Sequence, residues 1–262
     1  MQRKSILVLL QTSTPLISKA TISQIRLLHH KKHRDEQGLF IVEGVKSCME
    51  TLQSNFEVTD CYTTDTLSVG LNLRYIKLSA KEMERISCLA TAPEILCIVR
   101  KSHFQLSDFD DNKSLLVLDS IRDPGNLGTL IRTADWFGFD QILCSEDCVE
   151  FTNPKVIQAS MGSFTRVKIV YANLGDYLKM QDRRTIYGLY MNGEHIQKQV
   201  YQNNDIVIIG SESHGISGAL LPYITKKIEI PMFPHKNATP ESLNAAIAAG
   251  IFMFEFRKSI KN

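Results

Sequence analysis

The sequence predicts an α/β protein whose second half contains a mostly parallel sheet. Short apolar runs alternate with helical patterns from Ser114 onward, and several of these runs are followed directly by polar or glycine-rich loops. A strand that is buried on both faces of a parallel sheet reads as a continuous apolar run. Regular alternation of strands and helices is typical of a sheet with helices on both faces. We therefore expect such a sheet, preceded by a smaller α/β domain.

The smaller domain is expected to begin after Pro15. Its elements in chain order are a helix over 18–31, a strand over 39–42, a helix over 45–52, strands near 58–63, 75–78 and 94–99, and a helix near 81–87 between the last two strands. The stretch from Lys101 to Ser114 is polar and has little periodicity, so we place a domain boundary there. The predicted limits are 1–15 for a disordered extension, 16–106 for the first domain and 107–262 for the second.

The second domain is expected to alternate strands and helices to its end. Strand-like runs lie at 114–118, 140–144, 167–171, 185–190, 206–210 and 228–231. Helical patterns follow Asn126, Asn153, Leu174 and Ser217, and a last one covers 241–257. No internal repeat is evident.

Composition restricts the class of protein but does not identify a partner. The chain has 262 residues, 44% of them hydrophobic, and a formal net charge of +2. These values are typical of a folded globular protein. From Ser18 to Arg34 the chain has no acid and carries five cations: Lys19, Arg26, Lys31, Lys32 and Arg34. This stripe could contact phosphate, or it could be a solvated helix end, since Asp35 and Glu36 follow at once.

The six cysteines and the N-terminus indicate a reduced cytoplasmic protein. The cysteines are scattered through apolar surroundings without a CxxC pair. Cys144 and Cys148 lie four apart with no histidine near, so no metal site is predicted. The apolar patch over 6–10 is too short for a membrane-crossing or secretory segment.

The segment over 118–138 is the strongest candidate for chemistry. Asp123-Pro124-Gly125 breaks the apolar run, and the apolar residues Leu127, Leu130, Ile131 and Ala134 then recur at helical spacing. Asn126 is a plausible N-cap of this helix. Arg132 points away from its core face, and Gly128, one turn earlier, would let a ligand approach the backbone.

Two further loops follow strands in the same half. The run over 206–209 stops at Gly210 and is followed by Glu212, with neither a Walker A ending nor a GxGxxG pattern. Thr239 and Pro240 predict a helix start, with Ser242 and Asn244 in its first turns. Taken singly, Asn126 could be only a cap, Ser242 a first-turn filler and Glu212 a solvated acid. Together with Arg132 and Asn244 they would line one crevice, because loops after parallel strands converge at the carboxyl edge of a sheet.

The segments NLGTLIRTADWFG, IIGSESHG and IPM…ESLNAAIAAG resemble, in order, the three motifs of the SpoU (TrmH-type) branch of the SPOUT RNA methyltransferases. HHKKHRDEQGLFIVEG resembles the substrate-binding domain of ribosomal protein L30e type that many members carry. The resemblance covers roughly residues 17 to 257.

The resemblance implies transfer of a methyl group from S-adenosylmethionine to a ribose 2′-hydroxyl of RNA, by a SPOUT domain with a C-terminal trefoil knot that forms homodimers. The motif positions would place five residues at the catalytic site: Asn126, Arg132, Glu212, Ser242 and Asn244. Backbone groups of the knot loops would hold the cofactor: Gly210, Ile230, Met232 and Leu243. The N-terminal domain would capture RNA through Lys31, Lys32 and Arg34.

The role of Arg132 is open between two interpretations. The family proposal makes it a general base, but arginine side chains stay protonated in proteins. The alternative is a bidentate clamp on the adjacent phosphate that also stabilises the developing alkoxide. Ribosomal RNA is the expected substrate by analogy. Alternatives are a transfer RNA 2′-O-methyltransferase and a non-catalytic RNA-binding homologue, and a dinucleotide-dependent oxidoreductase is disfavoured because the glycine fingerprint is absent.

Overall fold

A computed structural model describes residues 17–64, 75–102, 104–233 and 242–260. The chain divides into two compact units, the first from Met1–Ser102 with Thr152–Pro154 and the second from His103–Phe151 with Lys155–Asn262. The predicted extension over 1–15 lies outside the described residues.

The first unit contains a mixed four-stranded sheet in the order β1-β4-β2-β3 among the described residues. β4 pairs antiparallel with β1 and β2, and β3 pairs parallel with β2. Its elements are α1 (Lys19–Leu27), α2 (Lys31–Gln37), β1 (Leu39–Glu43), α3 (Val45–Leu52), β2 (Val58–Thr63), β3 (Ile76–Lys77), α4 (Ala80–Ile86) and β4 (Ile95–Arg100).

The single helix predicted over 18–31 is wrong, because the chain forms α1 and α2 there with a turn between them. His30 has extended backbone angles and begins α2. The guanidinium of Arg34 is buried and donates to the carbonyl oxygens of Leu28 at 2.9 Å and His29 at 2.8 Å. These bonds occupy carbonyl groups at the end of α1, which a single continuous helix would have used internally.

The second unit contains a six-stranded sheet in the order β10-β8-β9-β5-β6-β7 among the described residues, and neighbouring strands pair in parallel throughout it. This confirms the predicted parallel sheet. Its strands are β5 (Leu115–Leu118), β6 (Gln141–Cys144), β7 (Lys168–Tyr171), β8 (Ile186–His195), β9 (Ile206–Ile209) and β10 (Lys226–Glu229). Its helices are α5 (Pro124–Trp136), α6 (Pro154–Ser160), α7 (Leu174–Leu178) and α8 (Ala245–Ser259), with short 3-10 turns at η1 (Leu106–Asp108), η2 (Ser163–Thr165), η3 (Ile196–Lys198) and η4 (Gly218–Tyr223).

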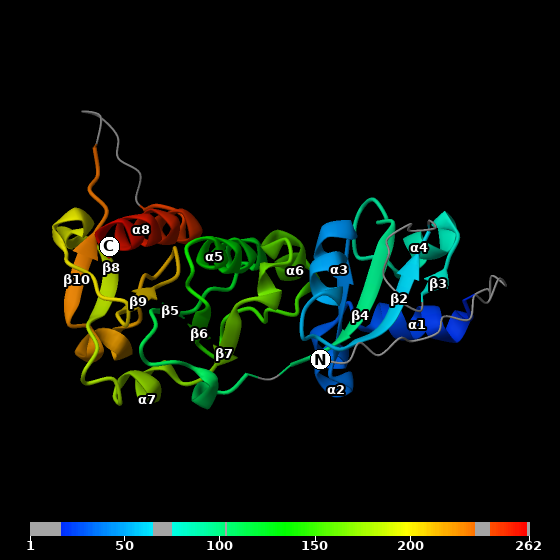
Figure 1. The fold of residues 1–262 in the computed structure, drawn as a ribbon, viewed down its shortest axis with the longest axis horizontal. Helices are drawn as coiled ribbons and strands as arrows, with labels where there is room; N and C mark the ends of the chain where they lie inside the picture. The colour runs from blue at the N-terminus through cyan, green and yellow to red at the C-terminus, as the bar shows by residue number, and fades with distance from the viewer. Residues whose placement is uncertain (1–16, 65–74, 103, 234–241, 261–262) are drawn as a thin grey trace, which may run out of the picture. The chain divides into compact units, whose positions relative to one another are not determined.

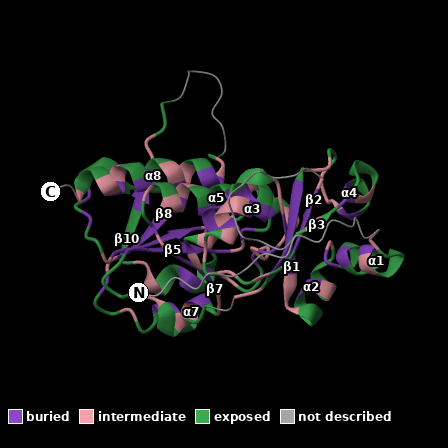
Figure 2. Cartoon of the chain, turned by 45° about the vertical axis from the view of Figure 1, so that its right-hand side comes forward, coloured by how far each residue is buried: buried purple, intermediate pink, exposed green. Residues whose placement is uncertain are grey.

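Helices cover both faces of this sheet. Figure 1 shows α5 and α8 along one face and α7 on the opposite side. Alternate strand residues, such as Leu115 and Val117, pack in one cluster with Leu174 and Leu178 of α7. Because side chains alternate across a strand, Leu116 and Leu118 face the α5 side. The central strands are therefore buried on both faces, as Figure 2 shows.

Candidate active site and cofactor pocket

Three polar side chains that follow three strands meet at the carboxyl edge of the parallel sheet. Asn126 lies in α5 after β5, Glu212 follows β9, and Asn244 precedes α8. The side-chain amide of Asn126 donates to Oε1 of Glu212 at 2.9 Å, and that of Asn244 donates to Oδ1 of Asn126 at 2.8 Å. Asn244 and, at 3.2 Å, the backbone N–H of Ala245 also donate to Oε1 of Glu212. One carboxylate oxygen thus connects the segments after β5, β9 and β10.

The helix caps differ from the prediction in a way that matters for this cluster. Asp123 is the N-cap of α5, since its Oδ1 accepts from the backbone N–H of Asn126 at 2.8 Å. Asn126 is therefore not the cap, and its own amide is available to Glu212. Asn244, placed by prediction in a first turn, is instead the N-cap of α8, accepting from Ala246 and Ile247. Thr239 and Pro240 lie outside the described residues.

A cavity of about 600 Å³ opens beside this cluster. All four residues expected to hold the cofactor line it, namely Gly210, Ile230, Met232 and Leu243. Ser242 and Glu212 line it as well, while Arg132 and Asn244 are not among its lining residues. Its volume falls within the range of roughly 300 to 1,000 Å³ that is usual for ligand sites. We call it the cofactor cavity after this expectation.

Two local features of the cofactor cavity bear on ligand binding. A Cβ at Gly210 would lie 2.1 Å from the carbonyl carbon of Gly215, so the loop between them closes tightly only with glycine there. Ser211 and Gly215 exchange backbone hydrogen bonds of 3.1 and 2.8 Å that hold this loop. The hydroxyl of Tyr190, another lining residue, is buried and has no hydrogen-bond partner in the described part of the chain. It could therefore bond to a polar atom of a ligand.

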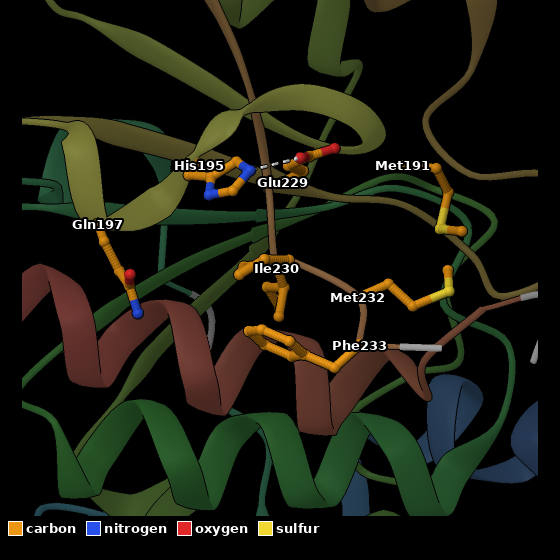
Figure 3. Close-up of a pocket in the computed structure, with 8 residues that line it drawn as sticks. Met191, His195, Gln197, Glu229, Ile230, Met232 and Phe233 are labelled. Carbon is orange, nitrogen blue, oxygen red and sulfur yellow. Dashed lines mark ion pairs between the residues drawn. The ribbon is translucent and has the colours of Figure 1, made fainter. Parts of the chain in front are cut away.

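A smaller cavity of about 350 Å³ shares Met191, Ile230 and Met232 with the cofactor cavity. Figure 3 shows the ion pair between His195 and Glu229 on one side of it, with an Nε2 to Oε1 distance of 3.2 Å. His195 lies beside Glu229 because β8 extends to His195, five residues beyond its predicted end, and pairs there with β10.

A third cavity, of about 550 Å³, is also lined by the loop from Ser211 to Gly215. Asn126 and Glu212 line it together with residues that sequence reasoning did not single out: Asp119, Ser120, Ile121, Arg122, Asp123, Ser213, His214, Ser217 and Ala245. The run of polar residues directly after β5 was the signal that could have revealed them. We call this the polar cavity.

Arg132 is exposed on α5 and has no hydrogen bond or ion pair among the described residues. It lines none of the three cavities.

The expectation that Gly128 lets a ligand approach is wrong, because this residue is buried against α6. A Cβ there would lie 2.5 Å from Cβ of Ala159 and 2.7 Å from the carbonyl oxygen of Val156. The glycine permits close helix packing instead.

Comparison with known proteins identifies the family. Residues 113–254, more than half of the chain, match the model of the SpoU rRNA methylase family. The chain belongs to the SpoU rRNA methylase family. Residues 19–97 match the MRM3-like substrate-binding domain, so the first unit resembles a substrate-binding domain.

Similar proteins extend over nearly the whole chain. The 23S rRNA (guanosine(2553)-2'-O)-methyltransferase RlmP of Bacillus subtilis is 27% identical over 88% of this chain and 93% of its own. Human mitochondrial rRNA methyltransferase 3 is 25% identical over 91% of this chain and 72% of its own. The crystal structure of the AdoMet-bound rRNA methyltransferase from Sinorhizobium meliloti has a TM-score of 0.82 and 26% identity, covering 93% of this chain and 96% of that one.

This family member is therefore an S-adenosylmethionine-dependent RNA 2′-O-methyltransferase with a SPOUT-type α/β fold, as its motifs predicted. No helix among the described residues is both long and apolar enough to cross a membrane. Within the same residues, no group of three or more His, Cys, Asp or Glu side chains is arranged to hold a metal ion.

The three residues expected to bind RNA in the first unit differ in their surroundings. The side chains of Lys31 and Lys32 are exposed and pair along α2 with Asp35 at 2.5 Å and Glu36 at 3.9 Å. Such exposed pairs are weak, so both ammonium groups can exchange their partner for a phosphate. Arg34 is buried and bonded to backbone carbonyls, which makes it a structural residue of the turn between α1 and α2. We therefore leave Arg34 out of the RNA surface.

Proposed function

We propose that the protein methylates a ribose 2′-hydroxyl of ribosomal RNA in the cytoplasm. One observation carries the proposal: the segments after β5, β9 and β10 of a SpoU family chain meet through Glu212 at the rim of the cofactor cavity. The names of the Bacillus subtilis and human relatives, both rRNA methyltransferases, support ribosomal RNA as the substrate. The six cysteines are all free thiols, which supports a reducing compartment.

In this proposal the cofactor lies in the cavity lined by Gly210, Ile230, Met232 and Leu243. When bound, S-adenosylmethionine supplies a methyl group on a sulfonium whose leaving thioether is neutral, so the leaving group needs no proton. The protein's task is to align the hydroxyl with the methyl group, which is worth up to ~7 to 11 kcal/mol in well-oriented reactions. The tight Gly210–Gly215 loop and the fixed cluster around Glu212 provide the rigidity for this alignment.

The five candidate catalytic residues divide into two roles. Glu212 fixes Asn126 and Asn244, and these amides together with Ser242 position the nucleotide or the cofactor. Arg132, whose guanidinium has no partner in the described residues, clamps the phosphate beside the target ribose and stabilises the alkoxide that develops as the hydroxyl loses its proton.

The proposal includes a trefoil knot in the second domain and a homodimer formed through it. Among the described residues, α8 presents an exposed apolar stripe of Ile247, Ile251 and Phe254, of which Ile247 and Phe254 are 57% and 55% exposed. A stripe with helical spacing on the outer face of a helix needs a covering partner. A second copy of this chain is the partner that the proposal assigns to it.

Replacement of Gly210 by alanine tests the cofactor site. The added Cβ would collide with the backbone at Gly215, so we expect S-adenosylmethionine binding, measured by isothermal titration calorimetry, to weaken at least tenfold. Gly218→Ala is a matched control, because a Cβ there meets nothing within 4 Å. Its affinity should equal that of the wild type.

Methyl transfer from labelled S-adenosylmethionine to transcripts of ribosomal and transfer RNA completes this test. We expect methylation of ribosomal RNA at a 2′-hydroxyl, lost with Gly210→Ala and retained with Gly218→Ala. A wild-type protein that binds no S-adenosylmethionine would contradict the enzymatic proposal and favour an RNA-binding homologue. Methylation of transfer RNA alone would contradict the substrate.

A further inference from the structure

We infer that the polar cavity receives the acceptor nucleotide and that Arg122 binds a phosphate of the RNA there. This inference rests on the proposed function, because it places the second substrate of the same reaction. It adds a substrate-binding residue that lies outside the five catalytic candidates.

The polar cavity has the position that an acceptor site requires. It shares five lining residues with the cofactor cavity, so molecules in the two cavities would lie beside the same loop: Ser211, Glu212, His214, Gly215 and Ala245. Glu212 and Asn126 lie at this boundary. Transfer of a methyl group needs the acceptor atom and the methyl group about 3 to 3.5 Å apart, which adjoining cavities permit.

The acids of the polar cavity are occupied by internal donors. Asp119 accepts from the backbone N–H of Ser217 at 2.6 Å, and Asp123 accepts from that of Asn126 at 2.8 Å. Glu212 accepts from Asn126 and Ala245. Neutral donors of the protein thus hold these three carboxylates in place. Among the described residues that line this cavity, Arg122 is the one arginine or lysine, so it supplies a permanent positive charge there that can attract a phosphate.

The Arg122 guanidinium is held in place by one hydrogen bond and keeps other N–H donors available. Its Nη2 donates to Oδ2 of Asp147 at 2.7 Å, while 74% of the side chain stays exposed. Nε and Nη1 make no hydrogen bond to the described residues. A guanidinium presents its donors in a planar fork that matches the oxygens of a phosphate. An arginine held by one nitrogen can therefore bind phosphate with the others.

Asp147 is itself fixed by the strained loop that carries Arg122. Its carboxylate accepts from the hydroxyls of Ser145 at 2.6 Å and Ser120 at 2.8 Å. These bonds and that from Arg122 lower the pKa of Asp147 to about 2, so it stays charged at working pH. Ser120 has a φ of 58°, unusual for a residue other than glycine. Such strain is kept where surrounding bonds enforce it, and it is concentrated at functional sites.

The test compares Arg122→Ala with the wild type and with Arg183→Ala, a control at an exposed arginine that lines none of the three cavities. With ribosomal RNA transcripts, we expect Arg122→Ala to raise KM for RNA about tenfold with little change in kcat. The affinity for S-adenosylmethionine should stay unchanged. The slope of log K against log salt for RNA binding should fall by about 0.7, the loss of one phosphate contact.

Asp147 acts on the RNA through Arg122, so it is a positioning residue. Asp147→Asn should raise KM for RNA in the wild-type background and have no further effect in the Arg122→Ala background. Additive effects of the two substitutions would contradict this coupling.

An Arg122→Ala variant with the KM and the salt slope of the wild type would overturn the inference while leaving the methyltransferase proposal intact. If the wild type methylated no RNA, the proposed function would fail, and the salt slope of binding would still decide whether Arg122 contacts phosphate.

Discussion

The candidate catalytic residues differ in whether their side chains already have hydrogen-bond partners within the chain. Asn126, Glu212 and Asn244 bond to one another, so their geometry is set before any substrate arrives. Arg132 has no such partner among the described residues. An exposed guanidinium without a partner contributes little to folding, whereas it can form strong charge-assisted bonds to RNA.

Substitution of Arg132 tests whether this residue takes part in the reaction, as a general base or as a phosphate clamp, or has only a structural role. We expect Arg132→Ala to lower kcat about 10² to 10³-fold, the usual effect of removing one group that stabilises developing negative charge. The affinity for S-adenosylmethionine should not change, because Arg132 does not line the cofactor cavity. Single-turnover methylation and calorimetry measure the two quantities. If Arg132→Lys kept near-wild-type turnover and RNA affinity, both the base and the bidentate clamp would be excluded.

The sequence could predict that Asn126, Glu212 and Asn244 come together here, but not how each is bonded, nor that Arg132 lies outside all three cavities. The order of strand, break and helix was enough to bring Asn126 and Glu212 to one edge. Whether Asp123 or Asn126 caps α5 depends on the exact residue at which the helix begins, and both types are good caps. Arg34 shows the same limit, since a cation in a basic stripe gives no sign that its guanidinium is buried on carbonyl groups.

Among the secondary-structure elements, α5 and α6 approach each other closely at Gly128. Gly128→Ala would force a methyl group to within 2.5 Å of Ala159, so the helices must separate. We expect the free energy of unfolding to fall by about 1 to 3 kcal/mol, as for other overpacked sites. Denaturant unfolding measures this change.

Gly250→Ala is the matched control for Gly128, because it places alanine in the interior of α8. A Cβ there would lie 3.5 Å from Cγ2 of Thr133, an ordinary contact. Helix propensity then favours alanine, and stability should rise by about 0.5 to 1 kcal/mol. Equal destabilisation by both substitutions would show that close packing is not what requires glycine at position 128.

Helices and strands could be predicted where apolar residues recur with a clear period. The residues at which these elements end could not be predicted. β8 was expected to stop at Tyr190, because the apolar run gives way soon after it to Asn192, Gly193 and Glu194. In the structure Gly193 lies so close to β10 that a Cβ would be 2.6 Å from the carbonyl carbon of Ile228. This contact extends the pairing to His195. Gly193 and Ile228 are 35 positions apart in the sequence, so a local sequence pattern cannot reveal their contact.

In the molecule as a whole, the strand order explains why the site lies where it does. β5 and β9 are neighbours in the sheet, although three strands (β6, β7 and β8) and three α-helices (α5, α6 and α7) lie between them in the chain. β8 lies between β9 and β10 in the sheet. The loops after β5, β9 and β10 therefore end at one edge. Sequence alternation indicates a parallel sheet but not its strand order, so the convergence could be expected only from the general rule for parallel sheets and from the family resemblance.

The exposed stripe on α8 leads to a prediction about assembly. If a second copy covers Ile247 and Phe254, the wild type should have twice the mass of the 29.6 kDa chain in solution, and a charge placed in the stripe should separate the subunits. Ile247→Glu and Phe254→Glu would each bury an unpaired carboxylate at the interface, which is strongly unfavourable. Light scattering after size-exclusion chromatography measures the mass.

The control for this prediction is Val200→Glu, since Val200 is 80% exposed and lies outside the helix stripe. It should leave the mass of the assembly unchanged. A wild-type protein of 29.6 kDa, or a Phe254→Glu variant that stays dimeric, would show that the stripe is not the contact between subunits. Circular dichroism of each variant distinguishes dissociation from unfolding, because a dissociated but folded chain would keep its helical signal.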